Sequence, residues 1–175
     1  MSRFLELRLR RWFGIDASVV TKVFDGNGQA KLWLPDDLAT VTGLIVKVDT
    51  DGDYSFSDET ALTIDTDFWV GPYNAALEPE PKPYEWLEVH PNSSVLSAWP
   101  EQQKSVQITA KWGWPAVPEA IKDATIMITR QLRDAEESGY TLSLESIDQA
   151  IPQGREVMTL LSRIERAYGK PPGVF

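Results

Sequence analysis

The acidic run Asp49-Thr50-Asp51-Gly52-Asp53 is the segment whose residue types come closest to a metal-binding loop. A calcium loop of the EF-hand kind needs glycine at its sixth position and a bidentate glutamate at its twelfth. Counted from Asp49, those positions hold Tyr54 and Thr60, so the pattern fails at both. We therefore interpret the run as a tight polar hairpin turn and predict no metal site.

Other catalytic patterns are equally incomplete. The single histidine, His90, follows a strand pattern, and the sequence has no Gly-x-Ser-x-Gly elbow. The chain has no cysteine, which excludes thiol catalysis, disulfides and Cys-ligated metals. Gly26-Asn27-Gly28 is too short to cradle a phosphate and precedes no helix. The 26 acids form too many possible pairs for a glycosidase pair to stand out. We predict no catalytic residue and no cofactor.

Seven tryptophans are many for 175 residues, and exposed aromatic side chains often anchor binding surfaces. Trp33 and Trp112 lie in alternating strand patterns, so we expect them in the core. Trp69, Trp86 and Trp99 lie near loops rich in proline, asparagine and acid, where exposure would mark a partner surface. Two interpretations stay open for this group: core packing and an exposed binding face.

The charge is distributed unevenly along a chain of net charge −9. Residues 36–101 carry fourteen acids and two bases, whereas the first twelve residues carry four arginines and one glutamate. Such an acidic middle disfavours nucleic-acid binding, because cations supply most of the affinity for phosphate. No apolar run is long enough to span a bilayer, and the N-terminus lacks the apolar core of a signal peptide.

Residue patterning predicts an α+β fold. We expect a short N-terminal helix ending at Gly14, then a central antiparallel β region with hairpins. One hairpin joins strands at 19–24 and 30–34 through the turn Asp25–Gly28. Further strands are expected at 44–48, 54–56, 84–89 and 105–112, with a proline-rich extended loop at 78–83.

Helical periodicity begins at Pro118, which suits the first turn of a helix. Apolar residues then recur at steps of three and four: Ile121, Ala124, Ile128, Leu132 and Ala135, before Gly139 as terminator. After the polar stretch 140–153, a second helix is indicated by Val157, Leu160, Leu161, Ile164 and Tyr168. We predict one domain over 1–168, β-rich at 19–112 and helical at 118–168, with an extended tail at 169–175.

Two blocks of this sequence are similar to a known family. Phe24-Asp25-Gly26-Asn27-Gly28, followed by Leu32-Trp33-Leu34-Pro35, resembles the central hairpin of the head–tail connector (adaptor) proteins of long-tailed bacteriophages. The run 106–114 leads into 117–124 and resembles that family's most recognisable block. That block is a strand ending in glycine and an aromatic residue, after which Val-Pro opens a helix. The order and spacing of these blocks, over roughly residues 10–168, carry the resemblance.

The resemblance implies a non-enzymatic structural protein of the virion neck, assembled in the bacterial host cytoplasm. Family members form a ring, typically of about twelve copies, beneath the portal protein. The ring extends the DNA channel and carries the next stopper or neck protein. The implied partners are therefore the portal protein, neighbouring copies, that downstream protein, and DNA that passes without specific binding; no membrane is implied.

The family also suggests candidate contacts. Its C-terminal helix and tail commonly dock on the portal, which here nominates Val157, Leu161, Ile164, Pro171, Pro172, Val174 and Phe175. We further infer that acids of the middle section face the channel or a neighbouring subunit, where negative charge keeps DNA from binding. These candidates are Asp49, Asp51, Asp53, Asp58, Glu59, Asp65 and Asp67.

Three alternatives stay open beside the adaptor. The chain could be another neck or tail-completion protein, a carbohydrate-binding β module that uses exposed tryptophans, or a phage lysis glycosidase. Quenching of tryptophan fluorescence by glycans would favour the second, and cell-wall zymography would reveal the third.

Overall fold

The computed structural model describes residues 3–137 and 155–170. These residues form two compact units, one β-rich and one helical. The β unit comprises residues 12–116, and the helical unit combines 3–11 with 117–137 and 155–170. The α+β class is confirmed. The predicted change from strands to helices, between Trp112 and Pro118, coincides with the end of the β unit. The sequence pattern did not indicate that the first helix belongs with the last ones.

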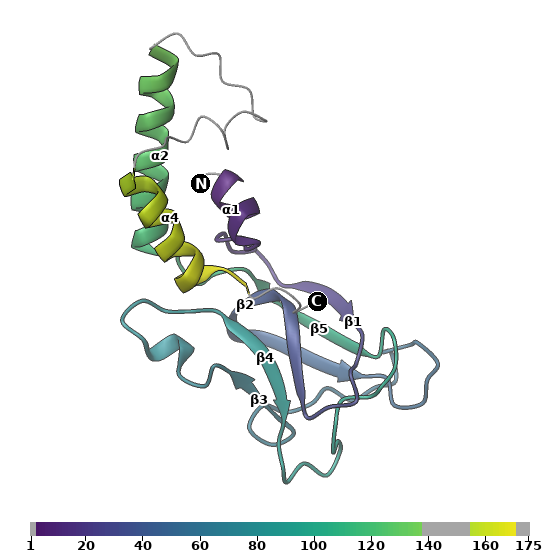
Figure 1. Ribbon diagram of the computed structural model, residues 1–175. Coiled ribbons are helices and arrows are strands. Elements are labelled where there is room, and N and C mark those ends of the chain that lie inside the picture. The colour runs from purple at the N-terminus through teal and green to yellow at the C-terminus, as the bar shows by residue number, and fades with distance from the viewer. Residues whose placement is uncertain (1–2, 138–154, 171–175) are drawn as a thin grey trace. The chain divides into compact units, whose positions relative to one another are not determined.

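The helical unit contains α1 (Arg3–Leu9), α2 (Glu119–Glu137) and α4 (Arg155–Tyr168), labelled as in Figure 1. α4 contacts both α1 and α2. The predicted stripe positions Ile121, Ala124 and Ile128 of α2 are buried, as are Leu5 and Leu9 of α1. The Lys170 N–H donates to the Leu9 carbonyl at 3.4 Å, and Arg8 forms an ion pair with Glu165. Both ends of the described chain are thereby joined.

Two boundaries in this unit were predicted from residue type. The Ile121 N–H donates to the Pro118 carbonyl at 3.0 Å, so α2 opens where proline is tolerated. α1 ends at Leu9 instead of Gly14, because Arg10 adopts a φ of 51° that stops the helix. Six expectations lie outside the described residues or side chains: Leu132, Ala135, Gly139, the stretch 140–153, Val157 and the tail from Pro171.

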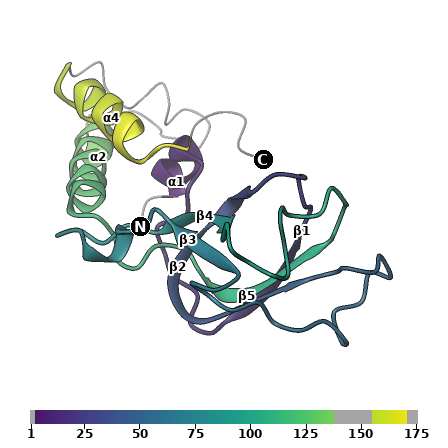
Figure 2. The ribbon, with the colours of Figure 1, turned by 90° about the horizontal axis from the view of Figure 1, so that it is seen from below.

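The β unit is built on one five-stranded antiparallel sheet in the order β1-β5-β2-β4-β3. The strands are β1 (Val20–Phe24), β2 (Lys31–Val48), β3 (Phe68–Gly71), β4 (Tyr84–Val89) and β5 (Val106–Trp112), with a short 3₁₀ turn at Ala75–Leu77. β2 pairs with β4 along its first part and with β5 along its second. Its register shifts between Trp33 and Leu38, around Pro35, which has no N–H to donate. Figures 1 and 2 show β2 curving between its two partners.

The predicted hairpin between residues 19–24 and 30–34 is wrong. β1 pairs with β5, and β5 lies between β1 and β2 in the sheet. The connecting residues bond to a distant loop instead of closing a turn. The Gly26 N–H donates to the Gln102 carbonyl at 2.9 Å, and the Asp25 carboxylate accepts the Lys104 N–H at 2.8 Å. Turn-forming residue types were correctly recognised, but a local pattern does not show which strands pair.

Two smaller strand predictions also differ from the structure. Residues 44–48 are the last part of β2 and not a separate strand. Residues 54–56 form no strand, and Val46 accepts the Leu62 N–H at 2.8 Å. The prediction for 84–89 is confirmed, that for 105–112 is right to within one residue, and 78–83 is a loop.

The core of the β unit contains Trp112 and Trp99, each 1% exposed. Trp112 was expected there. For Trp99 both core packing and exposure were left open, and the structure shows core packing: its Nε1 donates to the Ala30 carbonyl at 3.0 Å and its ring packs edge-on against Phe68. Trp33 was expected in the core, yet it is 46% exposed. Alternation along a strand shows which residues share a face, but not which face is covered.

Candidate functional site

The outer side of β2, β4 and β3 carries a cluster of partly exposed aromatic residues, Trp33, Trp69, Tyr73 and Trp86, which we call the aromatic face. Trp33 pairs with Trp86 across β2 and β4. Trp69 pairs with Glu88, two positions from Trp86, so these side chains share one side of the sheet. Ring centroids are 5.0 Å apart for Trp33 and Trp86, and 6.0 Å apart for Trp69 and Tyr73.

Trp86 is positioned by packing against the backbone of β3. Its register partner is Gly71, where a Cβ would lie 2.2 Å from the Trp86 ring. Glycine therefore allows the indole to rest directly on the strand. Within the described residues, the Trp86 Nε1 is buried without a hydrogen-bond partner, so shape and not polarity holds this ring.

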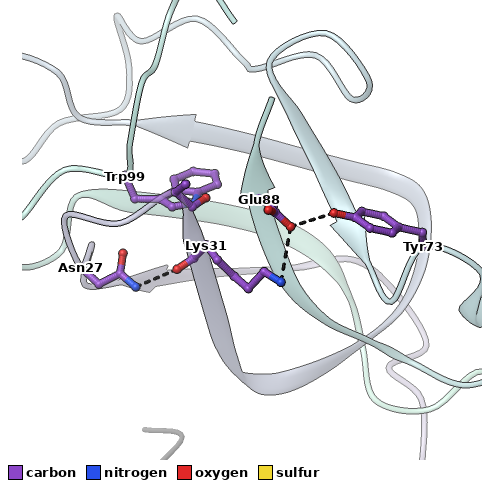
Figure 3. Close-up of polar contacts among 6 residues, drawn as sticks. Asn27, Lys31, Tyr73, Glu88 and Trp99 are labelled. Carbon is purple, nitrogen blue, oxygen red and sulfur yellow. Dashed lines mark hydrogen bonds and ion pairs between the residues drawn. The ribbon is translucent and has the colours of Figure 1, made fainter. Parts of the chain in front are cut away.

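Glu88 connects the polar groups of the aromatic face. Its Oε2 accepts a hydrogen bond from the Tyr73 hydroxyl at 2.7 Å and lies 3.4 Å from Lys31 Nζ (Figure 3). Lys31 Nζ also lies 4.6 Å from the centroid of the Trp86 ring. The hydrogen bond to Glu88, reduced solvation and the carboxylate charge raise the pKa of Tyr73 above its usual 10.0. Tyr73 is therefore a neutral hydroxyl at physiological pH.

A hollow of about 610 Å³ adjoins the aromatic face, with Trp69 and Glu88 in its wall. Further lining comes from His90, Ser94 and Ser97. His90 Nδ1 accepts the Asn92 N–H at 3.1 Å, so a neutral imidazole carries its proton on Nε2 as a donor. The imidazole packs edge-on against Trp69 at 4.5 Å between centroids. His90 directly follows β4, as its strand pattern indicated, and there it forms part of this wall.

The acidic turn brings carboxylate oxygens of Asp49, Asp51 and Asp53 within 4.8 Å of one another. Asp49 is 1% exposed, and its two oxygens accept the N–H groups of Gly52 at 2.7 Å and Tyr54 at 3.0 Å. Burial alone would raise the pKa of Asp49, but these backbone donors outweigh it and lower that pKa below 3.8. Asp49 therefore shapes the turn, as the sequence interpretation proposed, although no hairpin strand follows it.

The pKa of Asp51 shifts in the opposite direction to that of Asp49. The Asp53 N–H favours its ionised form, but lost solvation and the charges of Asp53, Asp58 and Asp49 outweigh that bond and raise the pKa of Asp51 above 3.8. A raised carboxyl pKa means that ionisation near neutral pH disfavours the folded state. Replacement of this charge should therefore stabilise the turn.

We expect Asp51→Asn to raise the urea midpoint of the β unit at pH 7 and low salt. Asparagine keeps an acceptor for the Asp53 N–H, at 3.2 Å in the native turn, and removes the repulsion. The gain should shrink in 1 M salt, and also on acidification as Asp51 of the native protein itself becomes protonated. Asp65→Asn, at another exposed acid, is the control. An unchanged midpoint at low salt would contradict the assigned repulsion.

The acids nominated for a channel or subunit contact separate into two groups. Asp49 and Asp67 are buried; Asp67 Oδ2 accepts the Thr63 N–H at 2.8 Å. Glu59 accepts both the N–H and the hydroxyl of Thr50, at 2.7 and 3.0 Å. These three acids hold loops together, so the original nomination was too broad. Asp51, Asp53, Asp58 and Asp65 remain exposed.

Two of the candidate portal contacts are buried. Leu161 and Ile164 are each 2% exposed, so they belong to the interior of the helical unit and are not surface contacts. The resemblance nominated them as portal contacts, whereas their positions on the apolar stripe of an amphipathic helix agree with burial. The side chain of Val157 and residues Pro171, Pro172, Val174 and Phe175 lie outside the described part of the chain.

Sequence reasoning missed a buried polar contact where β5 ends. Asp37 is 5% exposed, and its Oδ2 accepts the Trp114 Nε1–H at 2.9 Å. The Asp37 carbonyl also accepts the Gly113 N–H at 2.7 Å. Trp114 packs against Phe13 at 5.0 Å between ring centroids. In the sequence, the only sign of this contact was that Asp37 follows Pro35 closely, and an acid beside a proline by itself indicates a loop.

A second exposed surface, which we call the aliphatic face, lies on β1, β5 and the last part of β2. Thr21 pairs with Thr109, and Thr109 pairs with Ile45, so all three share one side. Val23 lies on the same side of β1, an edge strand, two positions from Thr21. Val23 is 45% exposed and Ile45 is 47% exposed. β-branched residues beside an open strand edge favour association with another chain.

No protein-family model, curated protein sequence or solved structure matches this chain. Among residues 3–137 and 155–170, no helix is long and apolar enough to cross a lipid bilayer.

Proposed function

We propose that the protein is a head–tail adaptor of a long-tailed bacteriophage, a structural component of the virion neck without catalytic activity. Its copies would form a ring below the portal protein and carry the next neck protein. The division of the chain supports this proposal most directly. A β unit is inserted between α1 and α2 of a helical unit that joins both ends of the described part of the chain. An adaptor must hold different neighbours, and separate units supply separate surfaces.

Two surface features are consistent with this role. The aliphatic face lies beside the free edge of β1, which suits contact with a neighbouring subunit. A closed ring of identical subunits needs this surface to meet a different patch on the next copy. The exposed acids Asp51, Asp53, Asp58 and Asp65 would repel DNA wherever they line its path.

Cosedimentation with portal-bearing, tailless heads of the cognate phage tests the proposal. We expect saturable binding near one subunit per portal subunit, and electron microscopy should show an added ring at one vertex. Val23→Lys should prevent ring formation because it places a charge beside the strand edge. Val95→Lys is the matched control, because Val95 is 56% exposed in a loop away from β1, and this variant should bind like the native protein. Absence of binding, where another neck protein binds the same heads, would contradict the adaptor role.

A further inference from the structure

The aromatic face and its adjoining hollow have the composition of a carbohydrate site. We infer that together they bind a neutral polysaccharide. This inference does not depend on ring assembly or on the portal. It revises the tryptophan interpretation of the sequence, because the residues involved are Trp33, Trp69 and Trp86, with Trp99 excluded by burial.

The aromatic rings supply stacking surfaces. Trp33 is 46% exposed and Tyr73 is 58% exposed. Trp33 lies on β2 and Tyr73 follows β3, the two strands that flank β4 in the sheet. Sugar rings have apolar C–H faces that pack on aromatic rings, and such contacts gain from burial as other aromatic contacts do. The face extends over three neighbouring strands spaced about 4.8 Å apart. A surface of that width suits several residues of a glycan chain better than one monosaccharide.

The hollow and its rim supply the polar groups that sugar hydroxyls require. In the wall, Glu88 is an acceptor and His90 Nε2–H is a donor. Lys31 lies outside the wall but adds a donor beside it, since its Nζ is 3.4 Å from Glu88 Oε2. Ser94 and Ser97 add exposed hydroxyl groups on the same lining. A few placed polar groups beside apolar surface are typical of small-molecule and sugar-binding pockets. The pairing of Glu88 with Lys31 and Tyr73 also fixes the carboxylate before a ligand arrives.

Charge selects the class of glycan. The chain carries −9, and Lys31, the cation of the aromatic face, is already paired with Glu88. An acidic polysaccharide or a nucleic acid would meet net repulsion here. The aliphatic face offers a contrast, because its exposed residues are valine, isoleucine and threonine, which suit a protein contact. A proline-rich peptide could also stack on aromatic rings, and the experiment includes it as a competitor.

Affinity electrophoresis of the full chain tests this inference. Native gels would contain soluble β-glucan, galactomannan or, as an acidic comparison, polygalacturonate. We expect at least one neutral polysaccharide to retard the protein and polygalacturonate not to. Trp33→Ala should weaken binding about tenfold. Trp12→Ala is the matched control, because Trp12 is also 46% exposed in the β unit but lies outside the aromatic face.

Three outcomes would overturn the inference. They are no retardation by either neutral polysaccharide, equal losses for Trp33→Ala and Trp12→Ala, and abolition of retardation by a decaproline peptide. Circular dichroism of both variants shows whether each is folded. If Trp33→Ala fails to fold, Tyr73→Phe, which removes only the hydroxyl that bonds Glu88, replaces it and should weaken retardation. Since no phage heads are present, the result is independent of the adaptor proposal.

Discussion

Gly113→Ala is expected to destabilise the β unit by about 3–5 kcal/mol. Gly113 has a φ of 109°, which side-chain-bearing residues rarely adopt. A Cβ at this position would also lie 2.0 Å from the Gly14 carbonyl oxygen. The neighbouring Trp114 N–H donates to that same carbonyl at 2.8 Å, so the two backbones cannot separate without losing the bond.

Urea denaturation followed by tryptophan fluorescence measures this effect. All seven tryptophans lie within residues 12–116, so fluorescence reports on the β unit alone. Gly52→Ala is the control, since Gly52 has a similar positive φ of 82° but its nearest neighbour is the Gln102 side chain, 3.7 Å from a Cβ. That variant should lose about 1 kcal/mol from backbone strain alone. Equal losses in the two variants would mean that the close approach to Gly14 does not matter.

Asp37→Ala is the second large effect, with an expected loss of about 2–3 kcal/mol. The substitution removes the acceptor for Trp114 Nε1–H, in a site where Trp114 is 2% exposed. A buried donor without a partner loses its hydration and gains nothing in return. Asp37→Asn retains an acceptor oxygen, so its loss should be smaller.

A double-mutant cycle separates the orphaned donor from other effects of the substitution. Trp114→Phe removes the N–H itself, so Asp37→Ala should cost less in that background than in the native protein. Fluorescence of the remaining tryptophans again follows unfolding of the β unit. Strictly additive losses would show that the hydrogen bond between Asp37 and Trp114 contributes nothing specific.

Both predictions concern the block 106–114, which ends β5 and leads toward α2. Its glycine allows close contact between Gly113 and Gly14, and its last aromatic residue bonds to Asp37. The block therefore stabilises the point where the chain leaves β5 for α2. Close backbone packing explains the glycine at 113, and the buried hydrogen bond explains the tryptophan at 114.

Local patterns in the sequence determined most of the secondary structure. Alternation predicted β4 and β5, and the three- and four-residue period after Pro118 predicted α2. Turn chemistry correctly marked 25–28 and 49–53 as irregular. The interpretation of the acidic run as a tight polar turn agrees with the Asp49 carboxylate, which accepts the N–H groups of Gly52 and Tyr54. These features depend on residues a few positions apart, so the sequence alone carries them.

Tertiary structure decided strand pairing and side-chain exposure. β5 lies between β1 and β2, although about sixty residues of sequence separate it from β2. That arrangement exposes Trp33, which was predicted to lie in the core, and buries Trp99, for which the sequence left both possibilities open. It also brings Asp37 to Trp114 and Tyr73 to Glu88. A period of two specifies which residues share a face, whereas only the partners of each strand determine which face is covered.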